Sequence, residues 1–344
     1  MSEKTIRVAI LGASGYTGLE LIRLVTGHPY MDLCGISSRT YAGQTLEEVF
    51  PRFAGSRFAG VKFVMPNEVK ELSVSAAFLA LPHGKAAEYA KELLAEGVKV
   101  FDLSADFRLR ELSVYEEFYG EHPAPELLET AVYGMPELYA EQIKKSELIA
   151  SPGCYPTSII LPLIPLLRNG LIDHKTIQAF SMSGATGAGR KESIPLLFCE
   201  VNESVRAYSL PKHRHLSEIE QELSFAAGEK VTMSFIPHLV PMQSGIATTI
   251  TVSLAGDLAS VGPALQEAYE DAPFIRLLGE GVCADTKNVT RTNFLDIGWH
   301  YDERTNRLMI TSAEDTIVKG ASGQAIHSFN IMFGLAESEG LTVL

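Results

Sequence analysis

The sequence predicts an α/β protein in which a doubly wound parallel sheet is joined to an α+β domain with a largely antiparallel sheet. In the first half of the 344-residue chain, short apolar runs alternate with segments of helical apolar period, the pattern of strands joined by crossover helices. In the second half the strand-like runs are longer, and two of them flank a short polar turn as in a hairpin.

The first half alternates between predicted strands and predicted helices. The order is strand, helix and strand, then a longer gap, then strand, helix and strand again. The ranges are 5–12 (TIRVAILG), 17–28 (TGLELIRLVTGH), 31–37 (MDLCGIS), 74–82 (VSAAFLALP), 84–97 (GKAAEYAKELLAEG) and 98–104 (VKVFDLS).

The second half contains mainly predicted strands, at 176–183, 230–237 and 246–254. The runs FLDIGWHY and RLMITSA flank the turn DERTN, which indicates an antiparallel hairpin. Pro162 and Pro165 interrupt the apolar run that precedes these strands, so we expect a short or bent helix there.

These patterns predict two domains and a returning helix. We expect a nucleotide-binding domain over residues 1–153 and a catalytic, substrate-binding and oligomerisation domain over 154–317. Residues 318–344 contain a further helical pattern, which we expect to pack back onto the first domain.

Composition and charge exclude several classes of function. The net charge of −13 disfavours nucleic acid and anionic membranes as partners, and no apolar run approaches membrane-spanning length. The start MSEKTIRVAILG lacks the regions of a signal peptide, so a cytoplasmic location is expected. Four scattered cysteines without CxxC spacing indicate reduced thiols and no metal site.

The stretch GASGYTG follows the first predicted strand and opens the first predicted helix. Its glycines let backbone amides approach a pyrophosphate at the helix N-terminus, as in a Rossmann-type dinucleotide site, although a plain tight turn remains the alternative. The cofactor-binding candidates of this loop are Gly12, Ser14, Gly15, Tyr16, Thr17 and Gly18.

The end of the second predicted strand indicates which dinucleotide binds. An NAD site normally places Asp or Glu there, but this chain reads GISSRT. Ser37, Ser38 and Arg39 are suited to a 2′-phosphate, so we predict NADP; a solvated surface charge is the other interpretation of Arg39.

Two further loops are candidates for ligand contact. LPHGK, with Pro82 and His83, follows a strand at the edge where doubly wound sheets bind ligands, although a loop histidine without a role is an equal alternative. SGATGAGRK, residues 183–191, offers backbone N–H groups to nicotinamide or phosphate, with Ser183 assigned to substrate and Gly184 to cofactor; a mobile turn is the alternative.

The stretch SPGCYPT predicts a nucleophile. Its Pro-Gly turn, and a proline suited to the first turn of a helix, place Cys154 at a helix start, where the partial positive charge favours the thiolate. The alternative is a buried cysteine that acts as a small hydrophobic residue.

Basic residues elsewhere supply candidate partners for this thiol. In KHRH, His213 and His215 face the same way if the segment is extended, and one of them is a candidate acid and base. Arg108, in SADFRL, is suited to bidentate binding of phosphate or carboxylate. The alternatives are a surface basic cluster and a structural pair of Asp106 with Arg108.

The motifs together carry a family likeness. GASGYTG, SSRTYAG, LPHG, DLSADFRL, YGMPEL, PGCYPT, SGATGAGR, KHRH, IPHLVPM and VKGASGQA occur in order over almost the entire chain. The chain resembles the N-acetyl-gamma-glutamyl-phosphate reductases of arginine biosynthesis, within the wider aspartate-semialdehyde dehydrogenase superfamily. PGCYPT with the downstream HRH is specific, whereas GASGYTG is shared with that superfamily.

The resemblance implies NADPH-dependent reductive dephosphorylation of N-acetyl-L-glutamyl 5-phosphate by a homodimer or homotetramer. It places the nucleophile on Cys154, the acid/base role on His215 and a substrate contact on His213. Three rival functions remain: a sister reductase for a carrier-bound acyl phosphate, an aspartate-semialdehyde-type dehydrogenase, and a non-catalytic NADP sensor.

The chain also departs from the family pattern, because PMQSG places Ser244 where the family usually has arginine.

Overall fold

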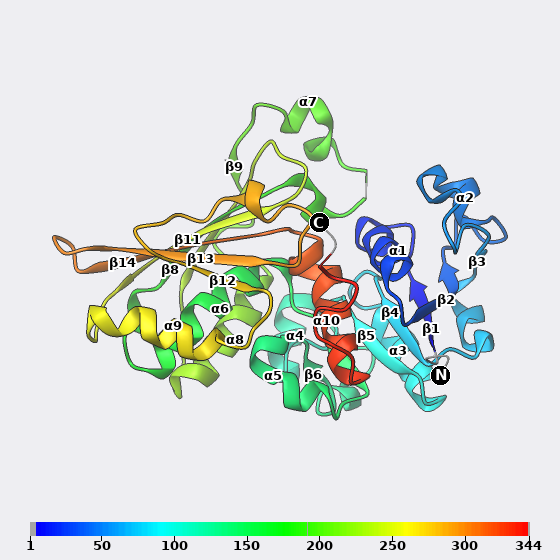
Figure 1. Ribbon diagram of the computed structural model, residues 1–344, viewed down its shortest axis with the longest axis horizontal. Coiled ribbons are helices and arrows are strands. Elements are labelled where there is room, and N and C mark those ends of the chain that lie inside the picture. Colours follow the sequence, from blue (N-terminus) through cyan, green and yellow to red (C-terminus); the bar gives the residue numbers. More distant parts are fainter. Residues whose placement is uncertain (1–4, 191, 343–344) are drawn as a thin grey trace. The chain divides into compact units, whose positions relative to one another are not determined.

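Two seven-stranded sheets organise the part of the protein that the structure describes (Figure 1). The computed structural model describes residues 5–190 and 192–342, so Lys191 at the end of the predicted glycine-rich loop lies outside the described residues. The chain divides into two units, one within Met1–Pro152 and Ala321–Val343, the other Gly153–Gly320. Within residues 5–190 and 192–342, no helix has the length and apolar character needed to cross a membrane.

The first unit is built on a parallel sheet of order β3-β2-β1-β4-β5-β7-β6, in which every described pair is parallel. The order reverses between β1 and β4, which creates the switch point where such sheets bind ligands. The strands are β1 Ile6–Leu11, β2 Met31–Ser37, β3 Phe63–Val64, β4 Ala76–Leu79, β5 Lys99–Asp102, β6 Val132–Tyr133 and β7 Leu148–Ala150. The helices are α1 Tyr16–Gly27, α2 Leu46–Val49, α3 Ala86–Ala95, α4 Leu112–Tyr119, α5 Pro136–Ile143 and α10 Gly323–Met332.

Strand alternation in this sheet directs side chains to two cores. Ala77 and Leu79 of β4 belong to the cluster that includes the buried alanines of α3. Phe78 points the other way and stacks on Phe101, with Phe329 of α10 within 6 Å of both rings. The C-terminal helix therefore completes the first unit, although it follows the second unit in sequence.

The second unit contains a mixed sheet of order β12-β13-β14-β11-β8-β10-β9. The pairs β8–β10 and β12–β13 are parallel and the others antiparallel, so the predicted largely antiparallel sheet is confirmed. The strands are β8 Gln178–Ser183, β9 Arg206–Ala207, β10 Ser234–Leu239, β11 Ile246–Ser253, β12 Ile275–Glu280, β13 Leu295–Asp302 and β14 Arg307–Glu314. The helices are α6 Cys154–Arg168, α7 Phe198–Val201, α8 His215–Ala227 and α9 Val261–Tyr269.

Helices α6, α8 and α9 lie on one side of this sheet in Figure 1, whereas α7 lies on the other. The strand β8 alternates accordingly, with Ala179 and Ser181 buried and Phe180 and Met182 exposed. We call the side that carries Phe180 and Met182 the open face.

We expected a short or bent helix after Cys154, and helix α6 is not short, because it runs for 15 residues through both prolines. A proline within a helix deprives the carbonyl four residues earlier of its N–H donor. Here Ser312 of β14 donates its hydroxyl to the Ser158 carbonyl at 2.6 Å, and Tyr269 of α9 donates to the Leu161 carbonyl. Side chains of neighbouring elements thus replace both missing donors, which sequence periodicity could not reveal.

The last predicted helix also differs in detail. The helical pattern was predicted over residues 318–336; in the structure a π-helical turn at Val318–Ser322 precedes α10, and α10 ends at Met332.

Candidate active site

Cys154 is the first residue of α6, and Gly153 caps this helix without a side-chain hydrogen bond. Its thiol is in no disulfide, and the residue is partly buried. The first N–H groups of a helix have no intrahelical acceptor and give its start a partial positive charge, which favours a thiolate over a thiol. The structure therefore places Cys154 where a nucleophilic cysteine is stabilised.

His215 lies directly beside this helix start. A Cβ atom added at Gly153 would lie 2.6 Å from His215 Nε2, so the imidazole occupies space that only glycine leaves open. His215 is also the first residue of α8, and the N-termini of two helices consequently meet next to Cys154.

Glu218, which the sequence analysis did not single out, joins these two helix starts. Its Oε1 accepts a hydrogen bond from the Gly153 N–H at 2.8 Å, and its side chain is buried. It follows His215 by three residues, which places both on one face of α8. That spacing, in HRHLSEIE, was the available sequence signal.

His213 occupies an aromatic enclosure formed by Tyr155, Tyr208 and Phe235, with ring centroids 5.5–5.6 Å away. Burial, and then the charge of Arg214, lowers the pKa of His213 to about 4. Its Nδ1 accepts the backbone N–H of His215 at 3.1 Å, which leaves the proton on Nε2 in the neutral ring. His213 is therefore a neutral hydrogen-bond donor near pH 7.

The two histidines are brought together by a helix start and not by an extended segment. Arg214, between them, has α-helical backbone angles, and the imidazole centroids are 4.9 Å apart with their planes at 74°. The two histidines lie side by side, as predicted, but the backbone between them is helical, where an extended segment was expected.

A cavity of about 400 Å³ opens in front of these groups. The predicted residues Cys154, Ser183, Gly184, His213 and His215 all line it. The described residues along its wall include three basic side chains and no acidic one, although the whole chain is acidic. The basic residues are Arg206, Lys212 and Arg214. The cavity is suited to an anionic small molecule.

Two tyrosines form the wall between this cavity and the core. The hydroxyls of Tyr155 and Tyr208 are 2.6 Å apart. Burial raises the pKa of Tyr208 to about 12 and raises that of Tyr155 further, so both phenols stay protonated at neutral pH. They provide hydrogen bonds and packing, and neither can serve as a base.

The glycine-rich loop of the cavity rests on the segment that carries Ser244. The N–H groups of Gly184, Ala185 and Thr186 donate to the carbonyls of Gly245, Met242 and Gln243. A Cβ atom at Gly184 would lie within 2.9 Å of backbone atoms of Met242 and Gln243, so the close approach requires glycine.

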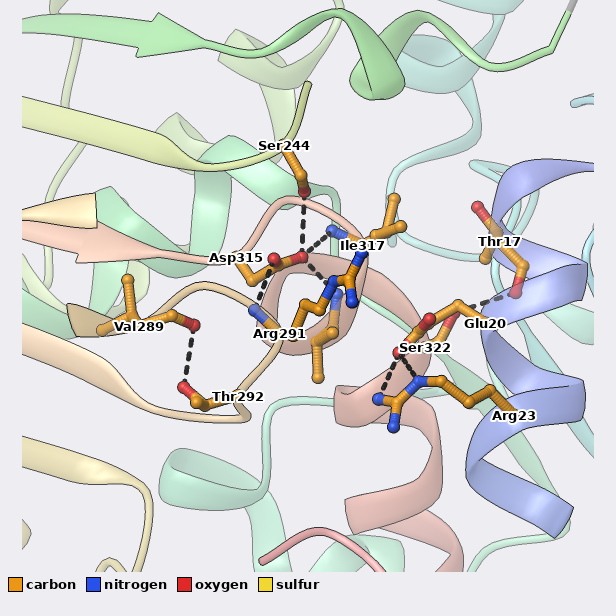
Figure 2. A network of polar contacts seen from close by, with 11 residues as sticks. Thr17, Glu20, Arg23, Ser244, Val289, Arg291, Thr292, Asp315, Ile317 and Ser322 are labelled. Carbon is orange, nitrogen blue, oxygen red and sulfur yellow. Dashed lines mark hydrogen bonds and ion pairs between the residues drawn. The ribbon is translucent and has the colours of Figure 1, made fainter. Parts of the chain in front are cut away.

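Asp315 holds this supporting segment in place (Figure 2). Its Oδ1 accepts the Ser244 hydroxyl at 3.0 Å and two amides, those of Ile317 and Val318, while its Oδ2 accepts the Arg291 amide at 2.8 Å. Ser244, the departure from the family pattern, therefore has a structural function in this chain.

The first unit contains the predicted nucleotide loop at the start of α1. Gly12 has φ +78°, and a Cβ there would lie 2.2 Å from the Ala80 oxygen; one at Gly18 would lie 2.5 Å from the Gly12 oxygen. At Gly15, by contrast, a Cβ would meet only the Gly12 oxygen at 3.6 Å. The fold thus requires the outer glycines, and the middle one leaves space for a ligand, as in pyrophosphate loops.

Further features fit an anion at this helix start. Helix α1 has no side-chain N-cap and no acidic residue in its first turn. Ser37 Oγ accepts the Gly12 N–H at 3.3 Å, and the hydroxyls of Ser14 and Ser38 are 3.3 Å apart. Arg39 is exposed at the end of β2. These residues fit the phosphates of an NADP molecule.

The other predicted residues of the first unit, Arg108 and Pro82, lie where side chains form hydrogen bonds with backbone groups. Arg108 is largely buried and donates through Nε to the Ser151 carbonyl at 2.8 Å and through Nη2 to the Leu103 carbonyl. Asp106 accepts the amides of Gly84 and Ala87, and thereby fixes the turn that contains Pro82. The substrate role of Arg108 and the cofactor role of Pro82 stay predictions.

Comparison with known families agrees with this arrangement. Residues 7–146 match a family model described as semialdehyde dehydrogenase, NAD binding domain, and residues 154–316 match semialdehyde dehydrogenase, dimerisation domain. The N-acetyl-gamma-glutamyl-phosphate reductase of Akkermansia muciniphila is 58% identical over 99% of this chain and 100% of its own length. That of Desulfotalea psychrophila is 48% identical over 98% and 99%.

The chain belongs to the N-acetyl-gamma-glutamyl-phosphate reductase family. The predicted family resemblance is confirmed. Solved structures with the same fold include aspartate semialdehyde dehydrogenase II complexed with ASA from Vibrio cholerae, with a TM-score of 0.72, 16% identity and coverage of 96% of this chain and 99% of that one. Aspartate semialdehyde dehydrogenase with NADP from Candida albicans gives 0.70 at 14% identity, with the same coverage. The predicted fold class is confirmed as well.

Proposed function

We propose that this member of the reductase family catalyses the NADPH-dependent reduction of N-acetyl-L-glutamyl 5-phosphate to N-acetyl-L-glutamate 5-semialdehyde, with release of phosphate, in arginine biosynthesis. The observation that carries the proposal is Cys154 at the joined N-termini of α6 and α8, beside His215 and in a cationic cavity. The reaction requires a nucleophile, an acid and base, and cations that hold a phosphate, and the second unit contains all three.

The first step is attack of the Cys154 thiolate on the acyl-phosphate carbonyl. A thioester forms on sulfur, and the carbon–oxygen bond to phosphate breaks. The Gly153 amide is already bonded to Glu218, and Pro156 has no N–H. The oxyanion donors at the start of α6 are therefore the amides of Cys154 and Tyr155.

The two histidines have different tasks in this proposal. His215, beside the helix start, takes the thiol proton and later returns a proton to the substrate oxygen. His213 stays neutral and donates a hydrogen bond from its Nε2–H to an oxygen of the substrate. The cations Arg206, Lys212 and Arg214 of the cavity bind the phosphate and the carboxylate.

The nucleotide loop of the first unit would hold NADPH, with its pyrophosphate at Gly12–Gly18 and its 2′-phosphate at Ser38 and Arg39. A bound reduced nicotinamide supplies the hydride that converts the thioester to the aldehyde level. None of the four cysteines forms a disulfide, which suits a reducing compartment such as the cytoplasm, where we place the protein. We further propose a homodimer or homotetramer, supported by the match to a dimerisation domain.

The charge of the cavity favours an N-acylated substrate. An enzyme for aspartyl phosphate must bind a free α-ammonium group, which calls for a carboxylate in the pocket. The described lining residues include no acidic side chain. An acetylated amine carries no charge and needs no such partner.

The test is the reverse reaction with purified protein. N-acetylglutamate semialdehyde, NADP and inorganic phosphate should give phosphate-dependent NADPH absorbance, with much lower rates for aspartate semialdehyde or NAD. Cys154→Ser should lose several orders of magnitude in turnover and keep NADP affinity, because a hydroxyl is a far poorer nucleophile at neutral pH. Equal rates with aspartate semialdehyde, or full turnover of Cys154→Ser, would contradict the proposal.

A further inference from the structure

The chain passes between its two units at two points, and both points lie next to the nucleophile. The divisions fall between Pro152 and Gly153 and between Gly320 and Ala321. Gly153 directly precedes Cys154 in sequence. A Cβ atom added at Gly320 would lie 2.9 Å from Cys154 Cβ and 3.2 Å from Cys154 Cα. The backbone at residue 320 therefore packs directly against the nucleophile.

Gly320 belongs to the π-helical turn Val318–Ser322, which we call the π-turn. Its N–H donates to the Asp315 carbonyl, five residues earlier, at 3.0 Å. Such turns inside helices often lie at functional sites. Moving this N–H to the carbonyl of residue 316 would give an ordinary α-helical bond and would shift Gly320 against Cys154. The π-turn is thus an element with two available hydrogen-bonding patterns.

The first half of the π-turn is fixed within the second unit. The Asp315 carboxylate accepts the amides of Ile317 and Val318 at 3.0 and 3.1 Å. Lys319 is fully buried, and its ammonium lies 5.6 Å from the centroid of the Phe274 ring. Because a buried charge is costly to move to a new environment, the start of the turn is held in place.

The end of the π-turn is tied to the nucleotide loop of the first unit. The buried Ser322 hydroxyl donates to the Thr17 carbonyl at 3.0 Å (Figure 2). Thr17 belongs to the loop Gly12–Gly18 and to the first turn of α1. A pyrophosphate that binds the amides of this helix start also fixes the position of the Thr17 carbonyl. Only Ala321 separates Ser322 from Gly320.

We propose that the π-turn couples the nucleotide loop to the nucleophile, so that phosphates bound in the loop fix Cys154 and raise the reactivity of its thiol. Ser322 holds the end of the turn to Thr17, and Gly320 transmits this position to the start of α6. Both residues are buried, and a close-packed interior passes on a shift instead of absorbing it. A thiolate held at the helix start gains most from its partial positive charge. Gly320 and Ser322 act as positioning residues.

The test measures alkylation of Cys154 by iodoacetamide at neutral pH in the full-length protein, followed by mass spectrometry of its peptide. The probe is 2′-phospho-ADP-ribose, which carries the phosphates of NADP and lacks a nicotinamide that could cover the thiol. Calorimetry establishes saturation with this probe. The rate at Cys154 should rise about fivefold or more, the lower end of typical couplings between sites. The rates at the exposed Cys199 and Cys283 should not change.

Two pairs of variants locate the coupling. Ser322→Ala should still bind the probe, but the acceleration at Cys154 should fall below about twofold. Ser328→Ala is its matched control and should respond as the wild type does, because the buried Ser328 hydroxyl has no hydrogen-bond partner among the described residues. Gly320→Ala should slow alkylation with and without the probe. Gly60→Ala should not, because a Cβ there meets nothing within 4 Å.

An unchanged rate at Cys154 in the probe-saturated wild type would overturn the coupling, as would an acceleration that Ser322→Ala retains in full. The inference rests on the proposed function only in that the nucleotide loop holds NADP. If the probe binds and accelerates alkylation while the reverse reductase reaction shows no turnover, the proposed function fails and the coupling stands. If turnover is normal and the bound probe leaves the thiol unchanged, the coupling alone fails.

Discussion

Glu218 and Gly153 tie the first turns of α8 and α6 together through a hydrogen bond of 2.8 Å. An acidic side chain in a first turn usually complements the positive end of its own helix. Here the Glu218 carboxylate also accepts the capping amide of α6, so one buried residue fixes two helix starts. Cys154 follows this amide directly in sequence, and His215 lies on the same helix as the carboxylate. The relative position of nucleophile and base therefore depends on Glu218.

Glu218→Ala should lower both stability and turnover. Loss of the acceptor leaves the buried Gly153 amide unsatisfied, which costs about 1–3 kcal/mol, and lets Cys154 and His215 shift. We expect a lower unfolding free energy and a kcat reduced by at least about tenfold, because small misplacements of reacting groups are costly. Glu218→Gln keeps an oxygen acceptor and should recover most of the stability. Glu229→Ala, at an exposed site, is the control, and equal kcat values for all variants would refute the positioning role.

Gly153→Ala should inactivate the enzyme without loss of NADP binding. The new methyl group would lie 2.6–2.9 Å from three atoms of the His215 ring, so the imidazole or the helix start must move. We expect a kcat reduced by about 100-fold and an unchanged affinity for NADP, measured by titration. Gly27→Ala is the matched control, because a Cβ there meets nothing within 4 Å. An active Gly153→Ala would show that His215 is not required in its observed place.

His213 should make the protein less stable at acidic pH. Burial lowers its pKa in the folded state to about 4, from 6.5. As pH falls below 6.5 the unfolded chain takes up this proton and the folded chain does not, so stability is lost progressively down to about pH 4. His213→Gln should remove this contribution, and urea unfolding at pH 5 and pH 8 will measure it. Parallel pH dependence in both proteins would contradict the neutral state of His213.

Turnover gives an independent check of the same assignment. His213→Gln keeps a neutral N–H donor and should retain part of the turnover, whereas His215→Gln removes the proposed acid and base and should lose more. If His213→Gln instead loses more turnover than His215→Gln, the roles of the two histidines are reversed.

The sequence predicted the parts of the site that local patterns encode. PGCYPT placed Cys154 at a helix start, and GASGYTG placed three glycines at the end of a strand, because both depend on short-range turn and capping chemistry. The sequence could not predict contacts between distant elements. Glu218 meets Gly153 across 65 residues, and Ser312 supplies the donor that Pro162 removes from α6 across 154 residues.

The same limit explains why the length of helix α6 was not predicted. Interior prolines normally end a helix because a carbonyl loses its donor. In this chain hydroxyls from β14 and α9 take that place, and the 15-residue helix carries Cys154 at its start. Only the tertiary structure shows which side chains reach these carbonyls.

Substitutions of Asp315 and of Ser244 should differ sharply in how far they lower the free energy of unfolding. Ser244→Ala removes one of the four described hydrogen bonds to the Asp315 carboxylate, at a cost of about 1 kcal/mol, and should keep most of the activity. Asp315→Ala leaves three backbone amides without their acceptor and should cost about 3 kcal/mol or more, with reduced kcat because the loop containing Gly184 loses its support.

The variant Ser244→Arg tests whether residue 244 only supports the structure through Asp315 or also binds substrate. A guanidinium there would face Asp315, which can accept it as an ion pair in place of the Ser244 hydroxyl. If Ser244 acts only through Asp315, this variant should keep the KM for the acyl phosphate within about twofold, since about 0.4 kcal/mol separates such values. Thermal unfolding and steady-state kinetics measure both effects on one sample. A KM lowered by more than tenfold would instead show that an arginine at this position binds substrate, and that this chain works without that contact.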